Sequence, residues 1–301
     1  MPLTPQAAAV IDAAREAMPV PLHELGVAAL RRATSTVPPS MTPIHHVEDA
    51  EVATPAGFVS VRIYRPSEEP DLPVLQYMHG GGYAIGDLQT HDDYLRVLAN
   101  AAQVVIVSVD YRLAPEHPYP AGLDDCVKVW EWLQSSPVEL AADSTRLGMA
   151  GDSAGGALAF ALALRERDAD GRVPDAVVSL YGTTEMRVSN PEMSTPMLGP
   201  ESCEWFWDLY TPDRSVRDDA YCSVAVAADL SGLGSHLVVT AEYDPTRDAT
   251  EDYAERLKLA GNDVALHRYD GVMHGFATMV GILPEADDAL RRVVTFLHER
   301  L

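Results

Sequence analysis

A single serine lies between two glycines in the segment GDSAG, residues 151–155. An apolar stretch typical of a buried strand precedes it, and a helical pattern rich in alanine and leucine follows it. A serine at such a junction projects its hydroxyl from a tight turn, and glycines two residues before and after it avoid collisions between the strand and the helix. The spacing therefore predicts that Ser153 is a nucleophile, with the amino end of the following helix directed at its oxygen.

A serine hydroxyl needs a neighbouring base if it is to attack at neutral pH. In sheets of this kind the serine, the acid and the base follow one another along the chain in that order. Only three of the ten histidines lie far enough along the chain. His267 falls within a predicted strand, and His298 falls in the last turn of the terminal helix. His274 lies in the loop DGVMHGF, directly after a predicted strand, and is therefore the predicted base.

The acid is expected at the end of the preceding strand, SHLVVTAEYD, which terminates at Asp244 before a proline. A carboxylate there can accept a hydrogen bond from the imidazole and stabilise the imidazolium that forms when the serine loses its proton. Two rivals are nearby. Strand alternation turns Glu242 to the other side, and Asp248 lies one helical turn later. We therefore predict Asp244 as the acid and keep Asp248 as the alternative.

Three consecutive glycines follow another predicted strand, in the segment HGGGYAIGD. Glycine costs backbone entropy inside a regular element, so this run indicates a loop whose amides must point inward without side chains. Two such amides, together with that of Ala154, would bind the negative oxygen of a tetrahedral intermediate. His79, at the start of the loop, is expected to brace it by hydrogen bonds and not to act as the base.

Strand-like and helix-like segments alternate along most of the chain, which predicts an α/β fold. We expect a mostly parallel sheet of about eight strands with helices on both faces. The segment HHVEDAEVATPAGFVSVRIYRP predicts a hairpin that extends this sheet antiparallel at one edge. The other predicted strands are 73–79, 103–112, 145–151, 175–182, 235–244 and 263–271, and the predicted helices are 90–102, 122–135, 154–168, 247–260 and 285–300.

Two segments depart from this alternation. Residues 1–40 predict two helices with a turn near Pro19 and Pro21. Residues 184–222 follow a strand and contain two of the four tryptophans. Such an aromatic cluster is either a helix packed on the core or a lid over a pocket. Open α/β sheets bind ligands beyond the carboxyl ends of their strands, so the position of this insertion favours a lid.

Composition excludes several classes of protein. The formal net charge of −23 disfavours nucleic acid and anionic membranes as partners. No apolar run is long enough to span a membrane, and the amino terminus lacks the pattern of a signal peptide. The three cysteines, Cys126, Cys203 and Cys222, predict neither a disulfide framework nor a local metal site, although a Cys203–Cys222 bridge stays open. A reducing cytoplasm is the expected compartment.

Five ordered motifs, HGGGYAIGD, DYRLAPEHPYPA, GDSAGG, DPTRD and MHGF, resemble those of the hormone-sensitive-lipase-like family of bacterial esterases, family IV, in its GDSAGG branch. The resemblance covers nearly the whole chain. It implies an α/β-hydrolase core formed by residues 41–183 and 223–301, with a helical cap formed by residues 1–40 and 184–222. It also implies a catalytic triad and three oxyanion-hole donors, which are Ser153, Asp244 and His274, and Gly81, Gly82 and Ala154.

The expected function is therefore that of a serine carboxylesterase that acts on small-molecule esters through an acyl-enzyme. The resemblance implies a preference for short acyl chains and favours a homodimer formed through an edge of the sheet. Neither a metal nor an organic cofactor is expected. Two alternatives remain. One is an amide-bond hydrolase on the same scaffold, such as an arylamidase or a deformylase. The other is a non-catalytic small-molecule-binding protein, like the plant hormone receptors that resemble this family.

Overall fold

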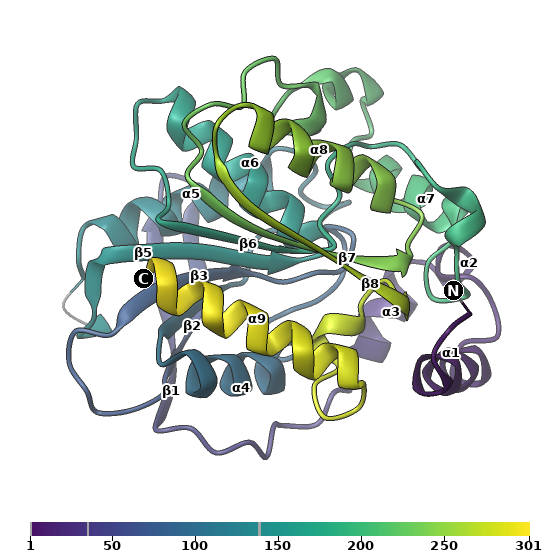
Figure 1. Cartoon of the computed structure of the whole chain (residues 1–301), viewed down its shortest axis with the longest axis horizontal. Helices are drawn as coiled ribbons and strands as arrows, with labels where there is room; N and C mark the ends of the chain where they lie inside the picture. Colours follow the sequence, from purple (N-terminus) through teal and green to yellow (C-terminus); the bar gives the residue numbers. More distant parts are fainter. Residues whose placement is uncertain (1, 35, 138–139) are drawn as a thin grey trace.

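The central feature of the molecule is one mixed sheet, seen in a computed structural model that describes residues 2–34, 36–137 and 140–301 (Figure 1). Within these residues eight strands are ordered β1-β2-β4-β3-β5-β6-β7-β8. The β1–β2 hairpin is antiparallel and β2 pairs antiparallel with β4, whereas all other neighbours are parallel. The predicted fold is thus confirmed. The strands are β1 (His46–Thr54), β2 (Gly57–Arg65), β3 (Pro73–Met78), β4 (Val105–Val109), β5 (Asp143–Asp152), β6 (Ala176–Leu180), β7 (Ser235–Tyr243) and β8 (Asp263–Met273).

Helices cover both faces of the sheet. Figure 1 shows α4 and α9 together on one face and α5, α6 and α8 on the other. Strands β3, β4 and β6 are buried along their whole length, which explains why their sequences are mostly apolar and do not alternate between apolar and polar residues. No described helix is both long and apolar enough to cross a membrane. The described α-helices are α1 (Pro5–Ala17), α2 (Leu22–Leu25), α3 (Val27–Thr34), α4 (Asp92–Ala102), α5 (Ala121–Gln134), α6 (Ala154–Asp168), α7 (Pro200–Tyr210), α8 (Arg247–Leu259) and α9 (Pro284–Arg300).

The amino-terminal segment differs from its prediction. Two helices were expected over residues 1–40, but the second is divided into α2 and α3. The division falls at Gly26, whose φ of 75° lies in the left-handed region that glycine adopts without steric cost. The prediction of two helices is therefore wrong, because Gly26 interrupts the second one.

The segment 184–222 contains α7 and two short 3₁₀ turns, η2 (Pro191–Met193) and η3 (Arg214–Asp218). Helix α7 lies beside α2 beyond the carboxyl ends of the central strands (Figure 1). Its aromatic face is buried, and Tyr210 stacks on Tyr83 with ring centroids 3.9 Å apart. The aromatic cluster therefore packs on the core through Trp207 and Tyr210 and also lines a cavity through Phe206 and Trp207.

Helix α3 is anchored to two loops of the sheet by one side chain, Arg31. Its guanidinium donates to the carbonyl oxygen of Ala84 at 2.8 Å and to that of Ala114 at 2.7 Å. It also donates twice to the Glu116 carboxylate, at 2.8 Å each. Bidentate pairing of this kind fixes orientation as well as distance. Glu116 thus has a structural contact.

The three cysteines are buried free thiols. The alternative of a Cys203–Cys222 bridge is therefore wrong. Burial raises the pKa of the Cys203 thiol and raises that of Cys222 to about 12. Both thiols are therefore protonated and unreactive at neutral pH.

Candidate active site

Ser153 is the single residue between the end of β5 and the start of α6. Its backbone has φ 52° and ψ −120°, a conformation that costs a residue with a side chain about 1–3 kcal/mol and persists only where the surroundings enforce it. One such constraint is a hydrogen bond from the Ser153 amide to the carbonyl oxygen of Leu180, at 2.8 Å. The junction is the strained turn that the sequence predicts at this position.

The two glycines that flank Ser153 are required by the close approach of backbone segments. A Cβ atom added at Gly151 would lie 2.3 Å from the carbonyl carbon of Gly155. One added at Gly155 would lie 1.9 Å from the carbonyl oxygen of Met78. Real Cβ atoms do not approach backbone atoms this closely, because the repulsion exceeds any gain from packing. The steric reason inferred from the G-x-S-x-G spacing is therefore seen in the structure.

Three side chains from distant parts of the chain meet at this turn. The Nε2 atom of His274 lies 2.8 Å from the Ser153 Oγ, and its Nδ1 atom lies 2.7 Å from the Asp244 Oδ2. Asp244 directly follows β7 and His274 directly follows β8, and the His274 amide donates to the Tyr243 carbonyl at 3.0 Å. These distances allow a proton to pass from the serine to the histidine while the carboxylate orients the ring.

Asp244 is buried, and its carboxylate is fully engaged. The amide and the hydroxyl of Thr246 both donate to its Oδ1 at 2.8 Å, while its Oδ2 accepts from His274. Burial raises the pKa of Asp244, but His274 and Thr246 lower it by more, so the group is ionised at neutral pH. Sequence reasoning did not single out Thr246. The available signal was an Asp followed two residues later by a threonine, a spacing that favours a side-chain turn.

His274 carries a pKa above its usual 6.5. Burial lowers this pKa, but the adjacent Asp244 carboxylate and its hydrogen bond raise it by more, and Asp152 adds to the rise. The ring of Tyr181 packs against the imidazole with centroids 4.8 Å apart. The histidine is thus a stronger base than a free imidazole, and its ring is held between an aromatic side chain and a carboxylate.

The residues that compete for these roles in the sequence are engaged elsewhere. Glu242 accepts from the Gly271 amide at 2.7 Å, and Asp248, the alternative acid, binds Arg247 at 2.7 Å. His267, on β8, contacts Arg292 at 3.2 Å. His298 contacts the Ala102 carbonyl oxygen at 3.0 Å. Among the predicted acids and bases, only Asp244 and His274 are in contact with the Ser153 system.

A cavity of about 220 Å³ opens directly onto these groups. Its polar end contains the predicted nucleophile and base together with all three predicted oxyanion donors, which are Ser153, His274, Gly81, Gly82 and Ala154. The rest of its wall is largely apolar and comes from α2, the glycine loop and the 184–222 segment. These apolar residues include Leu22, Tyr83, Ile85, Met197, Leu198, Phe206 and Trp207.

The glycine loop adopts conformations that other residues would resist. Gly81 has φ 122° and Gly82 has φ 58°. A Cβ at Gly81 would lie 2.1 Å from the Ile85 carbonyl oxygen, and one at Gly82 would lie 2.4 Å from the Phe206 ring. The absence of side chains thus lets the loop backbone pass under α7 and line the cavity, which is the property that the glycine run predicts.

His79 braces this loop through a neighbouring peptide group. Burial, followed by the effect of His91, lowers the pKa of His79 to about 4, so its ring is neutral. Its Nδ1 lies 2.7 Å from the carbonyl oxygen of Gly80, which can only accept. That carbonyl and the Gly81 amide belong to one planar trans peptide unit and point in opposite directions. By holding the carbonyl, His79 therefore sets the direction of the Gly81 N–H.

The arrangement can perform acyl transfer to a serine: a base contacts a hydroxyl, and backbone amides lie at the same cavity. Within the described ranges, no group of three or more histidine, cysteine, aspartate or glutamate side chains is arranged to hold a metal ion.

Comparison with known proteins agrees with this geometry. A family model described as the alpha/beta hydrolase fold matches residues 75–278. Carboxylesterase NlhH of Mycobacterium tuberculosis is 38% identical over 286 residues, 91% of this chain and 89% of that protein. Ethyl acetate hydrolase of Pseudomonas putida is 33% identical, with all of both chains covered. The hyperthermophilic esterase from the archaeon Pyrobaculum calidifontis has a solved structure that matches with a TM-score of 0.92 and 34% identity over 99% of this chain and 98% of that one. This chain therefore belongs to the α/β-hydrolase fold family, in its hormone-sensitive-lipase-like branch.

Proposed function

We propose that this protein is a serine carboxylesterase that hydrolyses small carboxylic esters through an acyl-enzyme on Ser153. The observation that carries the proposal is the continuous contact from the Ser153 Oγ through His274 to Asp244, at 2.8 and 2.7 Å. The named activities of the similar proteins, a carboxylesterase and an ethyl acetate hydrolase, support the same reaction class.

The reaction follows from the contacts. His274 removes the proton of the Ser153 hydroxyl as its oxygen attacks the ester carbonyl carbon, and Asp244 stabilises the imidazolium. The imidazolium then gives this proton to the departing alcohol, leaving an acyl group on Ser153. Water, deprotonated by His274, attacks the acyl carbon, and the acid leaves as Ser153 regains its proton. In each half of the cycle His274 takes up one proton and gives it back, so its ring is neutral at the start and at the end.

The negative oxygen of each tetrahedral intermediate is assigned to the amides of Gly81, Gly82 and Ala154. All three residues line the cavity that contains Ser153. Loss of one such donor in other hydrolases lowers the rate by about 10² to 10³. The helix that begins at Ala154 adds its partial positive charge at the same place.

Covalent labelling tests the proposal most directly. A fluorophosphonate should react with the native protein and add its phosphonyl group to Ser153, as located by peptide mass spectrometry. Hydrolysis of an aryl acetate should be lost in proportion to labelling. An unlabelled protein that still binds small esters would favour the non-catalytic alternative. A matched ester and anilide with the same acyl group would distinguish an esterase from an amide-bond hydrolase.

We expect short acyl chains to be preferred, because a cavity of about 220 Å³ lies below the usual 300–1,000 Å³ range of ligand pockets. Specificity constants for aryl esters should be highest for short acyl groups and should fall towards ten carbons. Met197→Ala, at the cavity wall, should move the optimum to longer chains, whereas Met41→Ala, at an exposed site, should not. A clear preference of the native protein for acyl groups of ten or more carbons would contradict this prediction.

The pH dependence of kcat/KM should reflect the His274 base, which must be neutral to accept the serine proton. Because the pKa of His274 is raised above 6.5, activity should already decline as the pH falls through a midpoint above that value. Asp244→Asn removes the charge that raises this pKa, so its acid limb should move to lower pH. The kcat of this variant should also fall. Breaking the same contact in another serine hydrolase lowers kcat by about 10⁴, and we expect a loss of that order. An unmoved limb in the variant would place the base elsewhere.

We infer three further features of the protein. Residues 1–40 and 184–222 are assigned to the cap, with residues 41–183 and 223–301 as the hydrolase core. The protein is assigned to the cytoplasm. A homodimer formed through an edge of the sheet is the expected assembly, and light scattering after size-exclusion chromatography would measure its mass.

A further inference from the structure

A second histidine–carboxylate contact lies beside the glycine loop and is not used by the mechanism above. Asp152, the last residue of β5, directly precedes Ser153 and lines the same cavity. Its Oδ1 lies 3.0 Å from the Nε2 of His91, and the two side chains are only 9% and 14% exposed. A buried carboxylate this close to a reaction that develops negative charge requires an explanation.

Asp152 holds the backbone of the glycine loop. Besides His91, its Oδ1 accepts from the Gly80 amide at 2.9 Å and from the Tyr77 hydroxyl at 2.8 Å. Three donors on one oxygen favour the ionised form. Burial raises the pKa of Asp152, but His91 and the other donors lower it by more. Asp152 holds the Gly80 amide, and His79 holds the Gly80 carbonyl. Both peptide groups of Gly80 are therefore fixed, and with them the position of the backbone that leads into Gly81 and Gly82.

The contacts of His91 favour a proton on both ring nitrogens. Its Nε2 faces the Asp152 carboxylate, which only accepts. Its Nδ1 lies 2.9 Å from the Thr90 Oγ1. The single hydrogen of that hydroxyl is directed at the Asp87 carbonyl oxygen at 2.7 Å, so towards His91 the hydroxyl can only accept. A ring whose two nitrogens both donate is an imidazolium.

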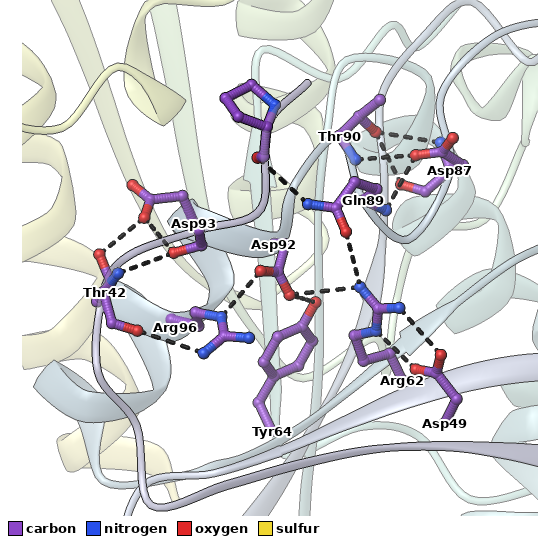
Figure 2. A network of polar contacts seen from close by, with 12 residues as sticks. Thr42, Asp49, Arg62, Tyr64, Asp87, Gln89, Thr90, Asp92, Asp93 and Arg96 are labelled. Carbon is purple, nitrogen blue, oxygen red and sulfur yellow. Dashed lines mark hydrogen bonds and ion pairs between the residues drawn. The ribbon is translucent and has the colours of Figure 1, made fainter. Parts of the chain in front are cut away.

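The residues that flank His91 in the sequence are held by hydrogen bonds, which Figure 2 shows for Thr90 and Asp92. On one side, the Asp87 carboxylate accepts from the Thr90 amide at 2.9 Å. On the other side, Asp92 accepts from Tyr64 at 3.0 Å and from Arg96 at 2.9 Å. The His91 ring is therefore presented to Asp152 by a segment with little freedom to turn it away.

We propose that protonated His91 neutralises Asp152, so that Asp152 can position the glycine loop without its negative charge opposing the oxyanion. His91 is thus a positioning residue that acts through Asp152. The inference rests on the proposed ester hydrolysis, because only a reaction that forms an oxyanion makes the neutralisation necessary.

The size of the effect follows from Coulomb's law. At an effective dielectric constant of about 20, the repulsion between two unit charges in one cavity is large enough to change a rate by roughly tenfold or more. An unpaired Asp152 would also act on His274, whose pKa it raises. Several other ionisable groups face the pair from the elements around it: Tyr77 and His79 from β3 and its loop, Asp87, Tyr94 from α4, Tyr111 after β4, and Tyr181 after β6.

The protonation of His91 can be measured without any substrate. Long-range ¹H–¹⁵N correlation spectra of the native protein at pH 7, assigned with His91→Asn, should show both nitrogens of this ring protonated. His79 should show one protonated nitrogen in the same spectrum. A neutral His91 tautomer at pH 7 would overturn the proposal. This readout does not depend on turnover, so failure of the proposal and failure of the esterase assignment are distinguishable.

A double-mutant cycle measures the consequence for the reaction. His91→Asn should lower kcat by about tenfold or more with little change in KM, and should move the acid limb of kcat/KM to higher pH. Asp152→Asn keeps an oxygen for Gly80 and Tyr77 but loses the charge, so its acid limb should move to lower pH. In the double variant, kcat should return towards that of Asp152→Asn, because no unpaired carboxylate remains.

His236→Asn is the matched control, because His236 is also a buried histidine but lies at the amino-terminal end of β7, where it contacts the Leu233 carbonyl at 3.1 Å. It should lower the melting temperature and leave the pH profile in place. If His91→Asn behaves in the same way, or if the losses in the double variant simply add, then His91 has only a structural role and the proposal fails.

Discussion

Replacing Ser153 with alanine should abolish ester hydrolysis while leaving the fold unchanged. The substitution removes one oxygen whose only described side-chain contact is the 2.8 Å hydrogen bond to His274, and alanine fits the same turn. Loss of the nucleophile in other serine hydrolases lowers kcat by about 10⁶, and we expect a loss of about 10⁴ or more. Steady-state hydrolysis of an aryl acetate, with circular dichroism and the melting temperature alongside, would measure it.

The same experiment tests whether the three side chains act as a unit. His274→Ala should lose nearly as much activity as Ser153→Ala, and the double variant should lose little more, because either change alone stops nucleophilic attack. Ser108→Ala is the matched control, because Ser108 is buried on β4 and its hydroxyl has no hydrogen-bond partner. This variant should remain fully active. If S153A kept most of the native activity, another residue would have to be the nucleophile.

Gly155→Ala should destabilise the protein, although the usual rule for helices predicts the reverse. Gly155 is in the first turn of α6, where alanine would be expected to stabilise a helix by up to about 1 kcal/mol. However, the new Cβ would lie 1.9 Å from the Met78 carbonyl oxygen and 2.7 Å from that of His79. Backbone atoms of a central strand cannot rotate away, so β3 and α6 must separate.

We expect a net loss of about 3 kcal/mol or more in the free energy of unfolding, at the upper end of the usual cost of overpacking. Activity per soluble molecule should fall at least about a hundredfold, because the separation shifts both the Ser153 turn and the glycine loop. Urea unfolding would measure the first effect. Kinetics normalised to fluorophosphonate-reactive sites would measure the second, even if most of the variant is insoluble.

Gly199→Ala is the control for this prediction. Gly199 is also at the amino-terminal end of a helix, as the N-cap residue of α7, and has a φ of −114°. A Cβ there would meet only the end of the Glu201 side chain at 3.7 Å. Its replacement should change the free energy of unfolding by less than about 0.5 kcal/mol. Equal stability of the two variants would show that the contact between β3 and α6 is looser than the structure indicates.

Local patterns in the sequence were sufficient to predict the fold and the principal candidates. Strands such as β3 and β4 bury both faces and are therefore mostly apolar in sequence, while α6 begins directly after the serine. The chain order of Ser153, Asp244 and His274 could be read because parallel strands end at one edge of the sheet, so residues that follow different strands are brought together.

Other features depended on which elements become neighbours in space. Asp152 and His91 come from β5 and from the loop before α4, and no periodicity along the chain relates them. Their contact exists because β3 lies between β4 and β5 in the sheet and carries its loop over the end of β5.

The sequence by itself determined the α/β class, the strained turn at Ser153, the inward-facing glycine loop and the order of the candidate triad, because each is set by side-chain size and periodicity over a few residues. Only the tertiary structure decided that Asp244, and not Asp248, faces His274, and that a second buried pair lies under the loop. Contacts between side chains of separate elements depend on strand order and register, and these arise from the packing of the whole sheet.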